Sequence, residues 1–385
     1  MADIDKAITF EDQVELGVRD RSKEMEVEVD IEEENPDFEG FEEMDDGSIM
    51  FGAPTPPMED TNFYSNLAEE LDSSELNSVV NDLMNNIDSD KESRSDWEKT
   101  YKEGLEYLGM KYEERSQPFE GASGVMHPLL AESVTQFQAQ AYNELLPSQG
   151  PVKTQVIGMA NAEIEQQASR VQEFMNYQLM QVMKEYDPET DQMLFYLPLS
   201  GSAFRKVYYD QNLGRAVSKF IPSEDLIVPY AATDLHSATR ITHVIDMSIN
   251  DIKKLQQVGF YRDVDISTGS LLADDVDDVQ SEIDELQGVS PSYDDDDTCR
   301  VHEVHTELDL EGYEDLDSEG EETGIKLPYI ITIANDKVLS IRRNYKETDQ
   351  LKQRINYFVH YKFLPGLGFY GFGLTHMIGG LSKAS

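Results

Sequence analysis

The sequence is poor in cysteine, in tryptophan and in long apolar runs. Its 385 residues include a single cysteine, Cys299, and a single tryptophan, Trp97. One cysteine excludes an intrachain disulfide and fits a reducing compartment. No apolar run approaches the roughly 20 residues that cross a bilayer, and residues 1–30 lack the apolar core of a signal peptide. These absences predict a soluble protein.

Basic residues are also scarce. The chain carries 77 acidic and 31 basic residues, a formal net charge of −46. Residues 1–90 contain 28 acidic and 4 basic residues, and residues 263–322 contain 23 and 1, so these two segments account for the whole imbalance. Because an acidic surface repels phosphate, tight binding to DNA or to an anionic membrane is disfavoured. A channel through which DNA slides is a different case, since attraction there would act as a brake.

The usual signatures of catalysis and metal binding are missing as well. The sequence has no Walker lysine motif, no G-x-S-x-G turn and no EF-hand spacing around Asp294–Asp297. His302 and His305 lie on a predicted strand, where an odd separation points two rings to opposite faces. His243 and His360 lie on other predicted strands, without an acid or cysteine at ligand spacing. The sequence predicts no catalytic, cofactor-binding or metal-binding residues, and a protein that is not an enzyme.

One glycine motif remains. In the closing stretch FLPGLGFYGFGLTHMIGGLSKAS, Gly366, Gly368 and Gly371 have G-x-G-x-x-G spacing. A dinucleotide-binding loop needs a parallel strand–helix–strand unit and an acidic residue about 20 positions further on. The sequence ends 14 residues after Gly371, and short turns join the preceding predicted strands, which favours an antiparallel sheet. We interpret the motif as a structural turn between a strand and a helix, with nucleotide binding as the alternative.

Composition and periodicity predict the organisation of the chain. They indicate an α+β fold in which a helical layer is followed by mainly antiparallel sheet, with acidic loops projecting from it. Within the tail, the apolar spacing from Leu67 to Ile87 fits one amphipathic helix. The predicted segments are an acidic, mostly disordered tail (1–90), helices followed by hairpin strands (91–262), an acidic flexible insertion with one strand (263–323), further strands (324–373) and the start of a helix (374–385).

Local signals predict individual elements. Trp97, Tyr101 and Leu105 recur at helical spacing, and further helices are predicted from Pro128, from Ile164 and after Asp187. The stretch PVKTQVIG predicts a short strand, and SAFRKVYYDQNLGRAVSKFI predicts a β-hairpin. The spacing of Ser248 and Asp251 predicts a capped helix that ends at Gly259.

Four stretches share the pattern of a known family. DWEKTYKEGLEYLGM begins a run, residues 96–154, with a tryptophan-bearing helix, a loop and a helix that ends in Leu-Pro. The others are the hairpin and proline-punctuated strands of residues 199–248, KLPYIITIANDKVLSIRRN, and the closing stretch quoted above. Through them, roughly residues 93–262 and 325–385 resemble the portal (head–tail connector) proteins of tailed bacteriophages, especially short-tailed viruses.

This resemblance implies a structural role. Portal proteins form a dodecameric ring at one vertex of the capsid in the virion, and they assemble in the bacterial host cytoplasm. Viral DNA is packaged through the ring by a separate terminase motor and is ejected through it toward the tail. The implied partners are further copies of the chain, capsid and scaffolding proteins, terminase and tail or adaptor proteins. The match covers mainly the wing of the family, so residues 374–385 are expected to begin its stem helix in a truncated sequence.

Two alternatives belong to other classes of protein. One is an enzyme that binds a nucleotide at Gly366, Gly368 and Gly371, which would bind NAD or ATP in equilibrium dialysis. The other is an acidic scaffold or adaptor that folds on its partner, which would form no closed ring. In the portal interpretation, the acidic tail keeps subunits apart before assembly or contacts scaffolding protein.

Overall fold

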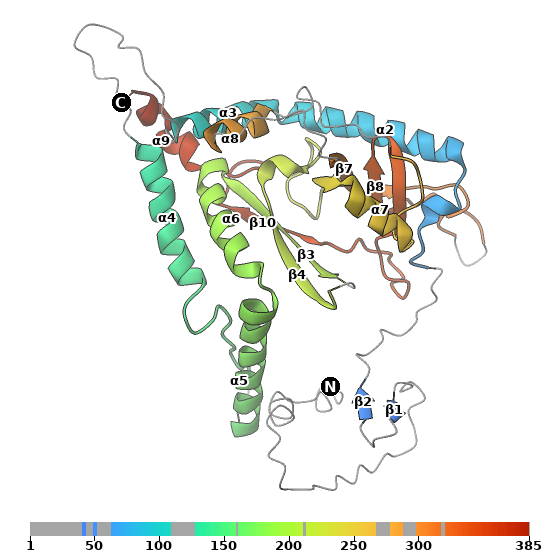
Figure 1. Cartoon of the computed structure of the whole chain (residues 1–385), viewed down its shortest axis with the longest axis horizontal. Helices are drawn as coiled ribbons and strands as arrows, with labels where there is room; N and C mark the ends of the chain where they lie inside the picture. Colours follow the sequence, from blue (N-terminus) through green and yellow to red (C-terminus); the bar gives the residue numbers. More distant parts are fainter. Residues whose placement is uncertain are drawn as a thin grey trace. The chain divides into compact units, whose positions relative to one another are not determined.

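The computed structural model of the chain describes residues 41–43, 49–51, 63–108, 128–158, 161–210, 213–266, 278–287, 298–316 and 320–384. It contains helices and antiparallel sheets, which confirms the predicted α+β class (Figure 1). The chain divides into two compact units. The first comprises Met1–Phe63 and Val152–Tyr177, and the second comprises Tyr64–Pro151 and Gln178–Ser385.

A helical layer forms one part of the second unit. The predicted spacing is realised in α3, where Tyr101 and Leu105 are buried against Leu130 of α4 and Leu199 of α6. The helical elements of this unit are η2 (Leu67–Glu69), α2 (Ser73–Ser93), α3 (Ser95–Tyr107), α4 (Leu129–Leu145), the π-turn η3 (Gln178–Val182), α6 (Tyr186–Ser200), η4 (Ser223–Asp225), α7 (Ile249–Gln257), α8 (Asp278–Gln287) and α9 (Leu374–Ala384).

A three-stranded antiparallel sheet follows the helices. Its order is β10 (Phe358–Lys362), β3 (Ser202–Asp210), β4 (Arg215–Ile221). Strands β3 and β4 form the predicted hairpin, with Gly214 at a φ of 61° in the turn. Helix α6 ends at Gly201, whose φ of 82° reverses the chain directly into β3.

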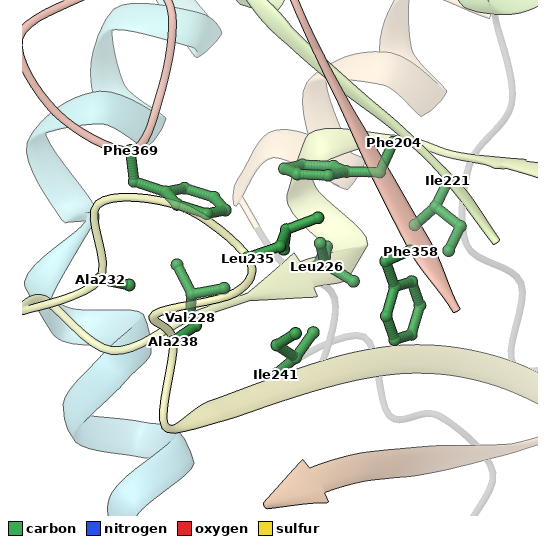
Figure 2. Close-up of a cluster of buried hydrophobic side chains, with 10 residues drawn as sticks. All are labelled: Phe204, Ile221, Leu226, Val228, Ala232, Leu235, Ala238, Ile241, Phe358 and Phe369. Atoms are coloured by element: carbon green, nitrogen blue, oxygen red, sulfur yellow. The ribbon is translucent and has the colours of Figure 1, made fainter. Parts of the chain in front are cut away.

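The second sheet has five antiparallel strands. Their order is β5 (Leu226–Ile227), β6 (Arg240–Ser248), β7 (Thr298–Leu308), β8 (Leu327–Ala334), β9 (Lys337–Arg343). The predicted cap is confirmed, because the Ser248 hydroxyl accepts the N–H of Asp251 at the start of α7. Side chains from both sheets meet in one apolar core, where Phe204 of β3 and Phe358 of β10 face Ile241 of β6 (Figure 2).

The first unit contains two described parts. Strands β1 (Phe41–Glu43) and β2 (Ile49–Phe51) form a hairpin. The other part is α5 (Ala162–Tyr177) with the chain that precedes it. The strand predicted for PVKTQVIG is wrong: this stretch is extended but pairs with α5, since the Val152 N–H bonds to Asn176 Oδ1 at 2.8 Å and the Thr154 N–H bonds to Gln172 Oε1 at 3.1 Å.

Two of the predicted segment boundaries need correction. The tail was predicted to extend to residue 90, but α2 continues to Ser93 and packs on β9, and Asp90 forms an ion pair with Arg240 at 2.6 Å. The amphipathic helix predicted in this region is therefore present, although it begins at Ser73. The rest of the predicted disordered tail lies mostly outside the described residues.

The second correction concerns the acidic insertion. Within it, α8 buries Val279 and Ile283 against α3, so this part is a packed helix rather than a flexible loop. Downstream, the Asp315 carboxylate accepts hydrogen bonds from Thr323 and Lys352, and the bond from Lys352 ties this part of the insertion to the body. Residues 267–277, 288–297 and 317–319 of the insertion lie outside the described residues.

Candidate functional site

The glycine motif lies in the loop between β10 and α9. Leu364 and Phe372 exchange two backbone hydrogen bonds, of 3.3 and 2.8 Å, which close the loop on itself. The N–H of Gly371 donates to Ser202 Oγ at 2.9 Å, and the N–H of Phe363 donates to the carbonyl of Gly201 at 3.0 Å. The loop is thus fastened to the turn that joins α6 to β3.

This fastening depends on glycine. A Cβ on Gly371 would lie 2.4 Å from the carbonyl oxygen of Gly201, and one on Gly373 would lie 2.4 Å from that of Leu199. Both distances are far below van der Waals contact, so no other residue fits without moving the backbone. Gly368 differs, because a Cβ there would meet no atom within 4 Å. Only part of the motif is therefore required by packing.

The geometry differs from that of a phosphate-binding loop. Strand β10 belongs to an antiparallel sheet, whereas the dinucleotide loop follows a parallel strand. The N–H of Gly371, which a phosphate cradle needs, is already bonded to Ser202. The loop has the features of the structural turn that the sequence predicts.

Trp97 connects the loop to the helical layer. Its ring stacks on Tyr370 of the loop at a centroid distance of 4.5 Å and on Tyr101 of α3 at 5.5 Å. Beside it, the buried guanidinium of Arg94 donates hydrogen bonds to the carbonyls of Ser223, Glu224 and Leu226 at 3.1, 2.6 and 2.9 Å. A guanidinium carries five N–H donors, so one arginine can bond several carbonyls at once. This one joins the α2–α3 junction to η4 and β5.

A serine–histidine pair also lies at this turn, and sequence reasoning missed it. Ser202 Oγ is 3.1 Å from His360 Nε2, across the β3–β10 pair. Ser202 is fully buried, and the imidazole packs against the rings of Phe204 and Phe369, with centroid distances of 4.4 and 4.7 Å. Burial lowers the pKa of His360 to about 3, with a smaller contribution from Lys362. Such a histidine is too weak a base near neutral pH, and the hydroxyl is closed to substrate.

The histidines lie on strands, as the sequence predicts. The sequence did not predict that His305 would contact the carboxylate of Glu303. His305 of β7 faces the three-stranded sheet, where its Nε2 is 2.8 Å from Glu303 Oε1. Lys206 of β3 reaches the same carboxylate at 2.6 and 2.7 Å. His243, opposite Glu303 on β6, borders this cluster, whereas His302 lies on the other face, as the odd spacing predicts.

The charges of this cluster are fixed by its surroundings. Burial opposes ionisation of Glu303, but the Lys206 ammonium and the hydrogen bond with His305 outweigh it and hold the pKa of this carboxyl well below its usual range. Burial lowers the pKa of His305, and it lowers the pKa of His243 to about 3. The cluster is therefore a buried ion pair with neutral histidines, which joins the two sheets and leaves no free general base.

These histidines predict an acid-sensitive fold. Because the folded pKa of His243 and of His360 lies below the unfolded value near 6.5, the unfolded chain binds more protons as the pH falls below 6.5. The stability that the two neutral histidines contribute is therefore fully present above pH 6.5. Below it, the free energy of unfolding falls by about 1.4 kcal/mol per pH unit for each histidine. Urea unfolding at pH 7.5 and 5.5 measures this loss.

A His243→Leu variant provides the check. Its Nδ1 has no hydrogen-bond partner among the described residues, so the leucine removes a titrating group without breaking a bond. We expect the difference in unfolding free energy between pH 7.5 and 5.5 to shrink by about 1.4 kcal/mol. An unchanged difference would contradict the assignment of a neutral, buried His243.

The remaining candidates of the sequence are a metal site and a membrane span. Asp294–Asp297 lie outside the described residues, and the part of the chain that is described has no cluster of histidine, cysteine and carboxylate side chains able to hold a metal ion. None of its helices is long and apolar enough to cross a membrane. Comparison with protein-family models and with curated proteins finds no match to this chain.

Proposed function

We propose that this chain is a structural subunit of a portal ring, through which viral DNA is packaged and ejected and which joins head to tail. The proposal keeps the partners that the resemblance implies: further copies of the chain, capsid and scaffolding proteins, a terminase motor and tail or adaptor proteins. It also places the protein at the portal vertex of the virion, after assembly in the bacterial host cytoplasm.

One observation carries the proposal: three of the four stretches that resemble portal proteins pack together at one junction. Trp97 from the first stretch stacks on Tyr370 from the last. Gly201 and Ser202 belong to the second stretch. The Gly201 carbonyl and the Ser202 hydroxyl accept hydrogen bonds from two backbone N–H groups of the same loop. If these stretches share the fold of one family, they should contact one another in the folded chain. The contacts at this junction meet that expectation.

The charge distribution supports the same proposal. Outside residues 1–90 and 263–322, the chain has 26 acidic and 26 basic residues. Binding to DNA grows with the number of phosphates that basic side chains neutralise, so a balanced body grips DNA weakly. Weak attraction suits a conduit through which DNA must slide.

Mass photometry of the purified full-length protein tests the proposal. We expect a discrete particle of about twelve subunits, because a head-to-tail interface that closes produces a ring of fixed size. Negative-stain images of the same sample should show a central channel. Solitary chains at micromolar concentration, or ATP turnover by the purified chain alone, would overturn the proposal.

A further inference from the structure

Among its described residues, the second unit has two sheets and therefore four edge strands, and three of these edges are covered. In each covered case a polar side chain bonds to the backbone of the edge: Asn66 at β9, Arg94 at β5 and Glu189 at β4. Asn66, for example, donates to the carbonyl of Leu339 and accepts the N–H of Ile341, each at 3.0 Å. Folded proteins cover their edges because an open edge pairs with other chains.

Strand β10 is the fourth edge, and its outward backbone groups are open. The Tyr357 carbonyl and the Phe363 N–H, at its two ends, bond toward β3. Since an antiparallel ladder bonds alternate residues, the residues of the other set turn their N–H and C=O groups away from β3. These are Phe358, His360 and Lys362, and no described residue makes a hydrogen bond to their backbone.

The two faces of β10 differ in chemistry. Phe358 points into the apolar core (Figure 2), and side chains alternate along a strand. Val359 and Tyr361 therefore point to the opposite face, where they are 44% and 37% exposed. Lys362 shares the face of Phe358, and residues 350–385 contain four basic residues and no acidic one. A strand added to this edge fits best with apolar side chains on one face and acidic side chains on the other.

One stretch of the sequence has this pattern. From Glu24 to Glu32, the residues EMEVEVDIE alternate strictly between acidic and apolar. Such a period of two is typical of a strand with one apolar face. The stretch lies outside the described residues. Added to β10, it would place four apolar side chains on the side of Val359 and Tyr361 and five carboxylates on the side of Lys362.

The open edge favours an occupant that arrives when copies assemble. The subunit covers its other three edges with its own side chains, whereas the described residues leave this one free for an outside strand. A donor stretch and an acceptor edge are different surfaces, so their pairing is head-to-tail and closes into a ring when the rotation allows. Their opposite charges also offset the repulsion between copies that each carry a net charge of −46.

We propose that Glu24–Glu32 of one copy adds as a strand to the β10 edge of the next copy, with Val27 and Val29 on the side of Tyr361. This inference rests on the proposed ring and names a contact that links its subunits. Backbone hydrogen bonds give strand addition its affinity, and the alternating side chains give it specificity. The basic surroundings of β10 supply the preference for an acidic strand.

A cysteine scan in the full-length protein tests the pairing. Tyr361→Cys is combined with a single cysteine at each position from 25 to 31 in turn. Because the backbone of Tyr361 bonds to β3, its side chain lies close to the residue opposite it on an added strand, at a separation that a disulfide spans. We expect ladders of linked chains only from odd positions, strongest opposite Tyr361, and about tenfold less or below from positions 26, 28 and 30.

Two features of the chain make the scan clean. The even positions are matched controls, since they belong to the same stretch but face the other side of the added strand. The native Cys299 is buried, and burial raises the pKa of its thiol, so it adds little background.

A charge variant gives an independent measurement. Val29→Asp should lower the fraction of ring in mass photometry by about tenfold or more, because it puts a carboxylate where an apolar side chain packs beside Tyr361. Val14→Asp is the matched control. It makes the same change in the acidic tail but outside Glu24–Glu32, and it should leave the ring intact.

The outcomes separate this inference from the function on which it rests. Equal linking from odd and even positions, links within single chains, or unchanged rings in Val29→Asp overturn the strand pairing and leave the portal proposal standing. Ladders with the expected alternation in a sample that forms no closed ring support the pairing and overturn the portal proposal. A wild-type protein that stays solitary and gives no ladder in the scan overturns both.

Discussion

Gly371→Ala is expected to destabilise the folded chain by about 3 kcal/mol or more, while Gly368→Ala changes stability by less than about 0.5 kcal/mol. The two glycines belong to the same motif, but their surroundings differ. A Cβ at Gly371 would lie 2.4 Å from the carbonyl oxygen of Gly201. The backbone fixes the position of both atoms, so neither can rotate away. Moving the loop to relieve this contact also breaks the hydrogen bond to Ser202. At Gly368 the added methyl group enters open space.

Urea unfolding followed by intrinsic fluorescence measures both changes. Trp97 is the only tryptophan and stacks on Tyr370 of the same loop, so its emission reports whether the loop is seated. A signal change before unfolding would mean that the loop detaches first in Gly371→Ala. If both alanines cost the same, the close approach at Gly371 does not hold the loop, and the motif has another role.

Most of the fold that could be predicted from the sequence depends on short-range patterns. The helical spacing of Tyr101 and Leu105, the hairpin turn at Gly214 and the cap formed by Ser248 each involve residues a few positions apart, and each is present in the structure. Local pattern determines local structure when burial and hydrogen bonding agree with it. The glycine motif belongs here too, since its expected strand-to-helix turn joins β10 to α9.

The errors come from partners that are distant in sequence. The acidic composition around α8 predicts a flexible loop, but Val279 and Ile283 are enough to seat this helix on α3, about 180 residues earlier in the chain. The PVKTQVIG stretch has the residues of a strand, yet it bonds to side chains of α5, which no strand pattern reveals. Composition therefore shows where the acidic residues are, but it does not show which helices pack against them.

The buried ion pair of Lys206 and Glu303 could not be predicted from short-range sequence patterns for the same reason. The two residues are 97 positions apart and belong to different sheets. One available signal was the alternation of β7, which turns Glu303 and His305 to the same face as apolar neighbours. A carboxylate on an apolar face needs a cation, but nothing in the sequence specifies which of the chain's basic residues supplies it.

Glu303→Gln is therefore expected to cost about 3–5 kcal/mol of unfolding free energy, because it leaves the Lys206 ammonium without its counter-charge between the two sheets. Both side chains are largely covered, with relative exposures of 14% for Lys206 and 18% for Glu303. The glutamine keeps the volume of the side chain and an acceptor for His305, so the loss measures the charge. An exposed pair is the control: Asp96→Asn removes the partner of Lys99, both highly exposed, and should cost less than about 1 kcal/mol.

The double variant Lys206→Met/Glu303→Gln distinguishes an unpaired charge from damaged packing. Methionine fills a similar volume without a charge, so most of the loss in Glu303→Gln should be recovered, since the cost comes from a cation without a partner rather than from the missing bond. Chemical denaturation of the four chains in the cycle at pH 7.5 gives the coupling free energy. A double variant as unstable as Glu303→Gln alone would show that the carboxylate stabilises the sheet contact through its other partner, His305, and not through Lys206.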